Sequence, residues 1–159
     1  MILRGLLIMP YPIFKILFCL SVMFSTLIGS LASAHEGVKN KDVLARMVLM
    51  SNMASNMKVI GKMARNPTEF DRKRAEEALL EIARLSEQTP DAFKIEANDP
   101  KSEAKAEIWT DFDNFKELSE NLMVDAKSLA GSVKISQNLR PALIKLSKSC
   151  KGCHSKFRE

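Results

Sequence analysis

The amino-acid sequence predicts an all-α protein, an antiparallel up-down-up-down four-helix bundle. After residue 34 no segment has the strict apolar-polar alternation that is typical of a β-strand. Four stretches instead repeat apolar residues at intervals of three and four, the spacing of one face of an α-helix. Mostly short connections separate these stretches, so consecutive helices are expected to be antiparallel neighbours. A helical hairpin that completes its core by dimerising is the alternative.

The first 34 residues differ in composition from the rest and predict a cleaved secretory signal peptide. Arg4 and Lys15 are their only charged residues, and an apolar run of about 16 residues follows. Ala32-Ser33-Ala34 offers small residues in the A-x-A arrangement of a cleavage site. The apolar run is shorter than the roughly 20 residues that span a bilayer, so a retained anchor is the less favoured alternative. Residues 35–159 are therefore expected to be exported, with no stable membrane span.

Residues 35–159 number 125 of the 159, which suffices for one small domain with a single core. They carry 22 Lys and Arg against 19 Asp and Glu, a formal charge of +3. The two signs are interspersed, which indicates a solvated surface and no nucleic-acid partner. Cys19 leaves with the signal peptide, so Cys150 and Cys153 are the only thiols of the exported chain.

The first helix is predicted over residues 42–64 and the second over residues 69–87. Asn66-Pro67 separates them, because the residue before a proline avoids the α region. The expected core-facing residues of the first helix are Val43, Met47, Met50, Ala54, Met57, Gly61 and Ala64. Those of the second helix are Ala75, Ala78, Leu79, Ile82 and Leu85.

The longest loop is predicted over residues 89–101, which contain Pro90 and Pro100 and show no sustained period. The third helix is expected over residues 102–130, with Gly131 as a C-terminal stop. Its expected core-facing residues are Ile108, Phe112, Phe115, Leu122, Ala126 and Leu129.

The fourth helix is predicted over residues 138–157. With Asn138 as the N-cap, Pro141 falls in the first turn, where its missing N–H is not needed. The core-facing residues are then Leu139, Leu143, Leu146, Cys150, Cys153 and Phe157. Both cysteines are thus expected to face the interior of the bundle.

Cys150, Cys153 and His154 form a Cys-x-x-Cys-His sequence, which can serve a zinc ion, a disulfide or a covalent haem. A structural zinc site needs four ligands, and the only other histidine is His35, so an acidic residue or a second chain would have to complete it. A redox-active pair needs a helix N-terminus, whereas these thiols lie near a predicted C-terminus, where the helix dipole disfavours a thiolate. A disulfide across three residues would constrain little unfolded chain.

Covalent attachment of haem agrees best with the residue types and their spacing. Two thioether bonds need two sulfurs on one helix face about a turn apart, and the i, i+3 spacing of Cys150 and Cys153 supplies them. The next residue, His154, is then the proximal ligand of the iron. The predicted export agrees with this, because c-type haem is attached outside the cytoplasm. The sequence therefore predicts one covalently attached haem c.

The chain resembles the class II c-type cytochromes, the family of cytochrome c′ and its low-spin relatives of the cytochrome c-556 type. The resemblance covers residues 35–159 and is carried by the C-terminal segment 150–158, Ile108-Trp109 followed by Phe115, and the segment from Arg46 through Met57. It implies the four-helix bundle with a haem near the C-terminus. Many members of the family form dimers through their first two helices, so the resemblance also implies a possible homodimer.

The resemblance implies roles for three further residues. Arg158 matches a basic residue beside the proximal histidine, and Arg46 matches a basic residue that can approach a haem propionate. For both, an ordinary solvated arginine is the alternative. Trp109, the only tryptophan, matches an aromatic residue that packs near the haem, with plain core packing as the alternative.

The distal ligand decides the function, because a thioether opposite His154 gives low-spin iron suited to electron transfer, whereas an apolar side chain leaves iron open to small gases. His154 lies about five residues, roughly 7 Å, from residue 159, and Met47 and Met50 lie about 8 and 12 Å from the start of their predicted helix. Met57 and Met63 lie beyond about 20 Å and are too far away.

The resemblance favours Met50 over Met47. Leu49-Met50-Ser51 followed by Asn56-Met57 looks like the low-spin relatives, in which the methionine at the Met50 position is the axial ligand. Five-coordinate members usually place leucine, phenylalanine or sometimes methionine at that position, so Met50 is predicted as the distal ligand without the five-coordinate state being excluded.

The sequence thus predicts a periplasmic monohaem cytochrome that carries single electrons between periplasmic redox partner proteins. No Ser/His/Asp constellation and no glycine-rich phosphate loop is present, so no enzymatic turnover is expected. The alternatives are a five-coordinate cytochrome c′ that binds nitric oxide or carbon monoxide, and a haem-free metal-binding or stress-related bundle.

Overall fold

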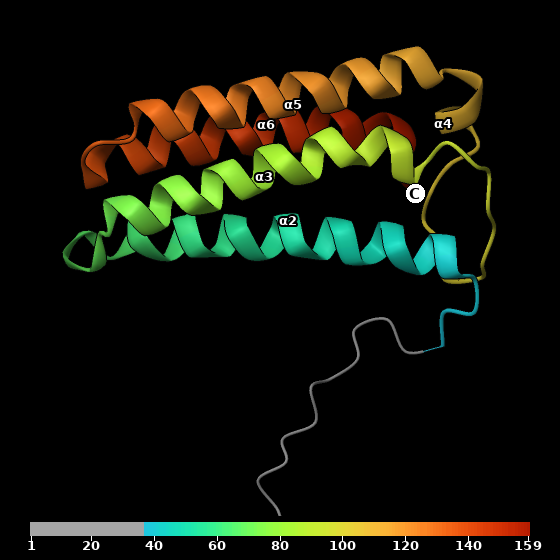
Figure 1. Cartoon of the computed structure of the whole chain (residues 1–159), viewed down its shortest axis with the longest axis horizontal. Helices are drawn as coiled ribbons and strands as arrows, with labels where there is room; N and C mark the ends of the chain where they lie inside the picture. The colour runs from blue at the N-terminus through green and yellow to red at the C-terminus, as the bar shows by residue number, and fades with distance from the viewer. Residues whose placement is uncertain (1–36) are drawn as a thin grey trace, which may run out of the picture. The chain divides into compact units, whose positions relative to one another are not determined.

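The computed structural model describes residues 37–159, in which four long helices lie side by side (Figure 1). The long helices are α2 (Lys41–Arg65), α3 (Arg72–Ala92), α5 (Phe112–Ser132) and α6 (Leu139–Phe157). The short elements are η1 (Pro67–Glu69), α4 (Glu107–Thr110) and η2 (Ser136–Asn138). The predicted signal peptide of residues 1–34 and His35 lie outside the described residues.

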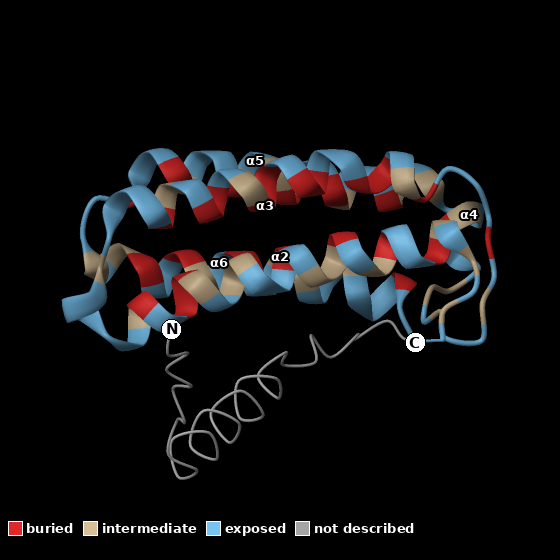
Figure 2. Cartoon of the chain, turned by 60° about the horizontal axis from the view of Figure 1, so that its bottom comes forward, coloured by how far each residue is buried: buried red, intermediate tan, exposed pale blue. Residues whose placement is uncertain are grey.

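The four long helices form the predicted antiparallel bundle. α2 packs against α3 and α6, and α5 packs against the same two helices. Figure 2 shows that the buried residues lie on the inward sides of the helices. The start of α2, the end of α6 and α4 lie at the same end of the bundle (Figure 1). Within residues 37–159, none of the helices combines the length and the apolar character that crossing a membrane requires.

α2 begins where predicted, but its buried face differs from the predicted one. Asn40 caps the helix, because its side-chain oxygen accepts the backbone N–H of Asp42 at 2.9 Å and of Val43 at 3.3 Å. Ala54 is exposed, so its predicted place in the core is wrong. The buried residues are Val43, Arg46, Leu49, Met53, Ile60, Gly61 and Met63. Packing against two neighbouring helices widens the buried face beyond one predicted stripe.

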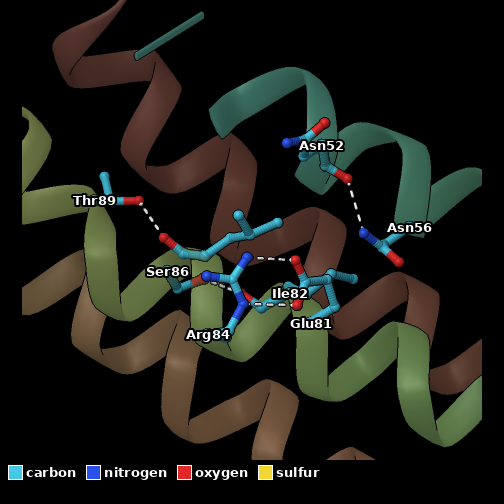
Figure 3. Close-up of polar contacts among 8 residues, drawn as sticks. Asn52, Asn56, Glu81, Ile82, Arg84, Ser86 and Thr89 are labelled. Carbon is cyan, nitrogen blue, oxygen red and sulfur yellow. Dashed lines mark hydrogen bonds and ion pairs between the residues drawn. The ribbon is translucent and has the colours of Figure 1, made fainter. Parts of the chain in front are cut away.

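α3 runs through Pro90 to Ala92, so the predicted loop begins later than residue 89. Proline removes the N–H that would donate to the Ser86 carbonyl in a regular helix. The Ser119 hydroxyl of α5 donates to that carbonyl instead, at 2.7 Å. The hydroxyl groups of Ser86 and Thr89 donate to carbonyls of the preceding turn (Figure 3). Side chains thus supply the hydrogen bonds of a helix end that sequence rules assign to a loop.

The third long helix begins at Phe112, ten residues later than predicted, and ends at Ser132, so Gly131 is not its stop. Residues 102–106 instead pair with the C-terminus in a short antiparallel contact between Ala104 and Arg158. The N–H of Lys105 donates to the Phe157 carbonyl at 3.0 Å, and the N–H of Glu159 donates to the Glu103 carbonyl at 2.9 Å. The backbone of this segment is therefore engaged with the end of α6 and is not helical.

Candidate functional site

Two groups of buried apolar residues meet near the end of α6. The first, the bundle core, joins residues of all four long helices, from Leu49 of α2 to Leu146 of α6. The second, the aromatic cluster, consists of Phe93, Ile108, Phe115 and Phe157. Its rings are closely packed, with the Phe115 centroid 5.0 Å from that of Phe93 and 5.4 Å from that of Phe157. The aromatic cluster therefore closes the end of the bundle that contains the Cys-x-x-Cys-His sequence.

Each of the two predicted attachment cysteines packs against one of these two groups of buried residues. Both thiols are free and half-buried in the last turns of α6, where Cys150 packs against the bundle core and Cys153 against the aromatic cluster. Burial raises the pKa of the Cys150 thiol. Burial and the neighbouring Cys150 raise the pKa of Cys153 to about 11, against the lowering effect of Lys156. The thiols are thus protonated at neutral pH, which disfavours a redox-active thiolate.

Met50 contacts both groups, because its side chain packs against the bundle core and against the aromatic cluster. The other methionines of α2 lie elsewhere. Met53 is buried in the core, where its sulfur lies 3.9 Å from the Ser86 hydroxyl, and Met63 is buried as well. Met57 packs against the bundle core alone, and Met47 is half-buried and belongs to neither group. Met50 is therefore the α2 methionine that shares its surroundings with both cysteines.

His154 directly follows Cys153 and lies in the last turn of α6 with its side chain exposed. Its pKa is lowered by partial burial of the ring and by the nearby Arg158, whereas Glu103 acts in the opposite direction. A neutral imidazole is the form that binds a metal ion. The environment of His154 therefore favours the state that an iron ligand requires.

Arg158 pairs with Glu103, and both side chains are about half exposed. Its backbone N–H donates to the His154 carbonyl at 3.1 Å. Arg158 thus lies beside the last turn of α6, close enough to His154 to affect its pKa. The role that the resemblance implies for Arg158 stays a prediction.

Arg46 is buried, with only 3% of its surface exposed, and its partners are backbone carbonyls. Its side-chain nitrogens donate to the Ala92 carbonyl at 2.9 Å, the Ala97 carbonyl at 3.3 Å and the Ile95 carbonyl. Burial lowers the pKa of its guanidinium, and the carboxylate of Asp42 opposes this effect. Arg46 therefore binds the end of α3 and the following loop to α2, a function that the sequence does not reveal. Its approach to a haem propionate stays a prediction.

Trp109 lies on α4 instead of on the third long helix, where the sequence places it. Its indole N–H donates to the Phe93 carbonyl at 2.8 Å, and its ring packs against the aromatic cluster. The Arg46 guanidinium lies 5.3 Å from the Trp109 ring centroid and 4.7 Å from that of Phe93, within the range of cation–π contacts. Trp109 thus helps to hold the aromatic cluster at the end of α6.

The residues present suit a covalently attached haem. Cys150 and Cys153 supply two protonated thiols one helical turn apart, and His154 supplies an imidazole next to them. The surrounding aromatic and aliphatic side chains match an apolar macrocycle. The described residues contain no group of three or more His, Cys, Asp or Glu side chains that could hold a metal ion.

Comparison with known sequences supports this assignment. A family model described as cytochrome C′ matches residues 41–158. Cytochrome c′ of Rhodospirillum rubrum is 32% identical over 116 residues, which cover 71% of this chain and 78% of the relative. Cytochrome c-556 of Agrobacterium fabrum is 25% identical over 118 residues, which cover 74% of this chain and 80% of the relative.

Solved structures share the fold. Cytochrome c′ from Rhodopseudomonas palustris matches with a TM-score of 0.70 and 24% identity, over 76% of this chain and 98% of that one. The nitric oxide complex of a mutant of cytochrome c prime from Alcaligenes xylosoxidans matches with a TM-score of 0.65 and 22% identity, over 74% and 94%. The chain therefore belongs to the cytochrome c′ family of non-enzymatic haem proteins, which bind one haem c covalently through a C-terminal Cys-x-x-Cys-His sequence.

Proposed function

We propose that this protein carries single electrons between periplasmic redox proteins, with His154 and Met50 as the axial ligands of a low-spin haem iron. When bound, haem c supplies reversible one-electron exchange between ferric and ferrous iron. The observation that carries the proposal is the position of Met50, whose side chain packs against both the bundle core, where Cys150 packs, and the aromatic cluster, where Cys153 packs. A thioether ligand raises the reduction potential and suits iron to electron transfer.

The chain's own residues provide the remaining requirements of an electron carrier. Cys150 and Cys153 would hold the cofactor through two thioether bonds to the end of α6. Phe93, Phe115 and Phe157 keep water from one side of the site, and a low dielectric disfavours additional charge on the iron. This environment raises the potential further.

The periplasmic location rests on two observations. The cytochrome c′ family is typically periplasmic, and the first 34 residues have the composition of a signal peptide. Cell fractionation with N-terminal sequencing of the purified protein tests the location. We expect the protein in the periplasmic fraction with His35 as its first residue, and an intact N-terminus on a membrane-bound protein would contradict cleavage.

Substitution of the two candidate methionines tests the ligand assignment. Met50→Leu removes the thioether but keeps an apolar side chain of similar volume, so the bundle should stay folded. We expect the Met50→Leu protein to react with carbon monoxide, and the control Met47→Leu to keep the wild-type spectrum. Gas reactivity in the Met47→Leu protein alone would assign the ligand to Met47, and unchanged spectra in both variants would exclude either thioether.

A five-coordinate, gas-binding protein is the second candidate function. It is favoured by the likeness in fold to a mutant of cytochrome c prime whose nitric oxide complex has been solved. Met50 is half-buried and its side chain is flexible. A methionine of this kind can lie near the iron without binding it. A wild-type protein that already binds carbon monoxide or nitric oxide rapidly would support this function over electron transfer.

A homodimer through the first two helices is also proposed, since α2 leaves apolar side chains uncovered. Leu44 is 36% exposed and Val48 is 41% exposed, one turn apart on the same face of α2. Exposed apolar neighbours of this kind are common at interfaces between subunits.

A further inference from the structure

Positive charge is concentrated in the C-terminal segment that contains α6 and the haem-attachment sequence. Residues 134–158 contain seven Lys and Arg and no Asp or Glu, a formal charge of +7. The rest of the chain from residue 35 onward contains 15 Lys and Arg against 19 Asp and Glu, a formal charge of −4. Although the net charge of residues 35–159 is small, their C-terminal segment is strongly positive and the remainder is negative.

The positive side chains of α6 lie on the side away from the bundle. At 100° per residue, the five cations of the helix fall within an arc of about 160°, opposite the buried residues. All five are exposed, and they are Arg140, Lys145, Lys148, Lys151 and Lys156. The opposite side contains the buried residues Leu139, Ala142, Leu146 and Phe157. We name the five cations, together with the exposed Ile144 among them, the basic face of α6.

Most of these cations lack an acidic partner. Among residues 37–159, only Lys145 of the basic face forms an ion pair, with Asp125 at 2.8 Å. Ile144 is 63% exposed and lies within the arc of cations. An apolar residue surrounded by uncompensated charge resembles the core and rim of a protein–protein interface. Lys148 and Lys151 lie on the same helix as Cys150, two positions before it and one after it, so the basic face and the attachment sequence share α6.

We propose that the basic face of α6 is the docking surface for an acidic face of the protein that exchanges electrons with this one. The inference rests on the proposed electron-transfer function and names the charge of the partner. Complementary charges steer association and raise its rate by about 10- to 1000-fold at low ionic strength. Docking on α6 would place the partner against the helix that holds the covalently attached group.

An anionic membrane surface fits the basic face less well. A helix that lies on a membrane inserts an apolar face into the lipid, with basic residues on its other face. The apolar face of α6 is already buried within the bundle, and Ile144 is the one exposed large apolar residue of this helix. A single side chain supplies little apolar area for insertion, which favours a protein partner.

Two matched double variants of the haem-loaded protein test the proposal. Arg140→Glu with Lys148→Glu reverses two charges of the basic face and leaves the Cys-x-x-Cys-His sequence intact. Arg72→Glu with Lys73→Glu gives the same net charge change in the exposed first turn of α3, where acidic residues are compatible with the helix dipole. Haem content and far-UV circular dichroism of both proteins verify that they are loaded and folded.

Isothermal titration calorimetry with poly-L-glutamate measures the affinity of the basic face for an acidic polypeptide. This measurement does not depend on electron transfer. We expect the wild type and the α3 variant to bind at low salt, and the α6 variant to bind at least roughly tenfold more weakly. Equal loss in both variants, or no binding by the wild type, would overturn the proposal. Selective binding of the wild type to phosphatidylglycerol vesicles but not to poly-L-glutamate would assign the face to a membrane and equally overturn it.

The rate of reaction with hexacyanoferrate, an anionic one-electron reagent, adds a kinetic readout. The α6 variant should react roughly tenfold more slowly at low ionic strength than the α3 variant, and salt should remove the difference. Equal rates at low salt would contradict the proposal. A high-spin, gas-reactive spectrum would instead refute the proposed electron-transfer function, while the titration would still report on the basic face.

Discussion

The hydrogen bond between Ser119 and the Ser86 carbonyl gives a quantitative test of how Pro90 is accommodated within α3. Ser86 has no exposed surface and Ser119 is 6% exposed, so water cannot replace the hydroxyl in a Ser119→Ala protein. A buried carbonyl without a partner costs about 1–3 kcal/mol. We therefore expect Ser119→Ala to lower the free energy of unfolding by about 1–3 kcal/mol, measured by urea denaturation followed by circular dichroism at 222 nm.

Ser119→Ala should change the free energy of unfolding little when residue 90 has a backbone N–H that can donate to the Ser86 carbonyl. In a Pro90→Ala background the new backbone N–H can bond the Ser86 carbonyl, so Ser119→Ala should cost less than about 0.5 kcal/mol there. The difference between the two backgrounds is the coupling energy of a double-mutant cycle. The exposed Ser128 of α5 gives a control, since Ser128→Ala should change stability by less than about 0.5 kcal/mol. Equal costs of Ser119→Ala in both backgrounds would refute the reasoning.

Three further predictions concern other parts of the bundle. The backbone N–H groups of Lys101, Asn40 and Lys39 lower the pKa of Asp99, so its contribution to stability is present above the unfolded-state value of about 3.9 and is lost as the pH falls below it. Asp99→Asn should therefore flatten the acid limb of a stability–pH curve, and an unchanged limb would contradict this. Arg46→Lys keeps the charge but cannot reach all three carbonyls, so urea denaturation should show a loss of about 2–4 kcal/mol; a loss below about 0.5 kcal/mol would exclude the anchoring role. Val48→Glu should convert a dimer into a monomer in sedimentation experiments, whereas a monomeric wild type would exclude the dimer.

The fold class, the neighbours of each long helix and the bounds of α2 and α6 could be predicted from the sequence. α6 follows local signals closely, since it begins at Leu139 with Pro141 in its first turn and buries Leu146 and Phe157. Local signals suffice there because apolar spacing, proline position and helix length all agree.

Other features depend on tertiary contacts that local patterns do not contain. Proline normally ends a helix, but Pro90 leaves the Ser86 carbonyl unpaired, and the hydroxyl of Ser119, 33 positions after Ser86 in the sequence, donates to that carbonyl. The burial of Arg46 against three backbone carbonyls excludes the solvated arginine that the sequence leaves as an alternative, and this burial has no sequence signature. The pairing of residues 102–106 with the C-terminus shortens the third helix for a similar reason. In each of these places, a residue distant in the sequence forms the hydrogen bond to a backbone group, and a local pattern does not contain that partner.

For the site, the sequence identified Cys150, Cys153 and His154 as a connected group, and the cytochrome c′ family supports the covalent haem. Met47 and Met50 both satisfy the distance argument along the helix, and the resemblance alone favours Met50 as the distal ligand. The contacts of Met50 with both the bundle core and the aromatic cluster support this choice, and ligation of the iron by Met50 stays a proposal.

The absorption spectrum of the reduced protein, recorded before and after addition of carbon monoxide, tests the central proposal most directly. With His154 and Met50 as ligands, the ferrous spectrum is expected to be low-spin and to change little with the gas. A high-spin ferrous spectrum that shifts readily on addition of carbon monoxide would contradict the assignment of Met50 and with it the proposed role in electron transfer.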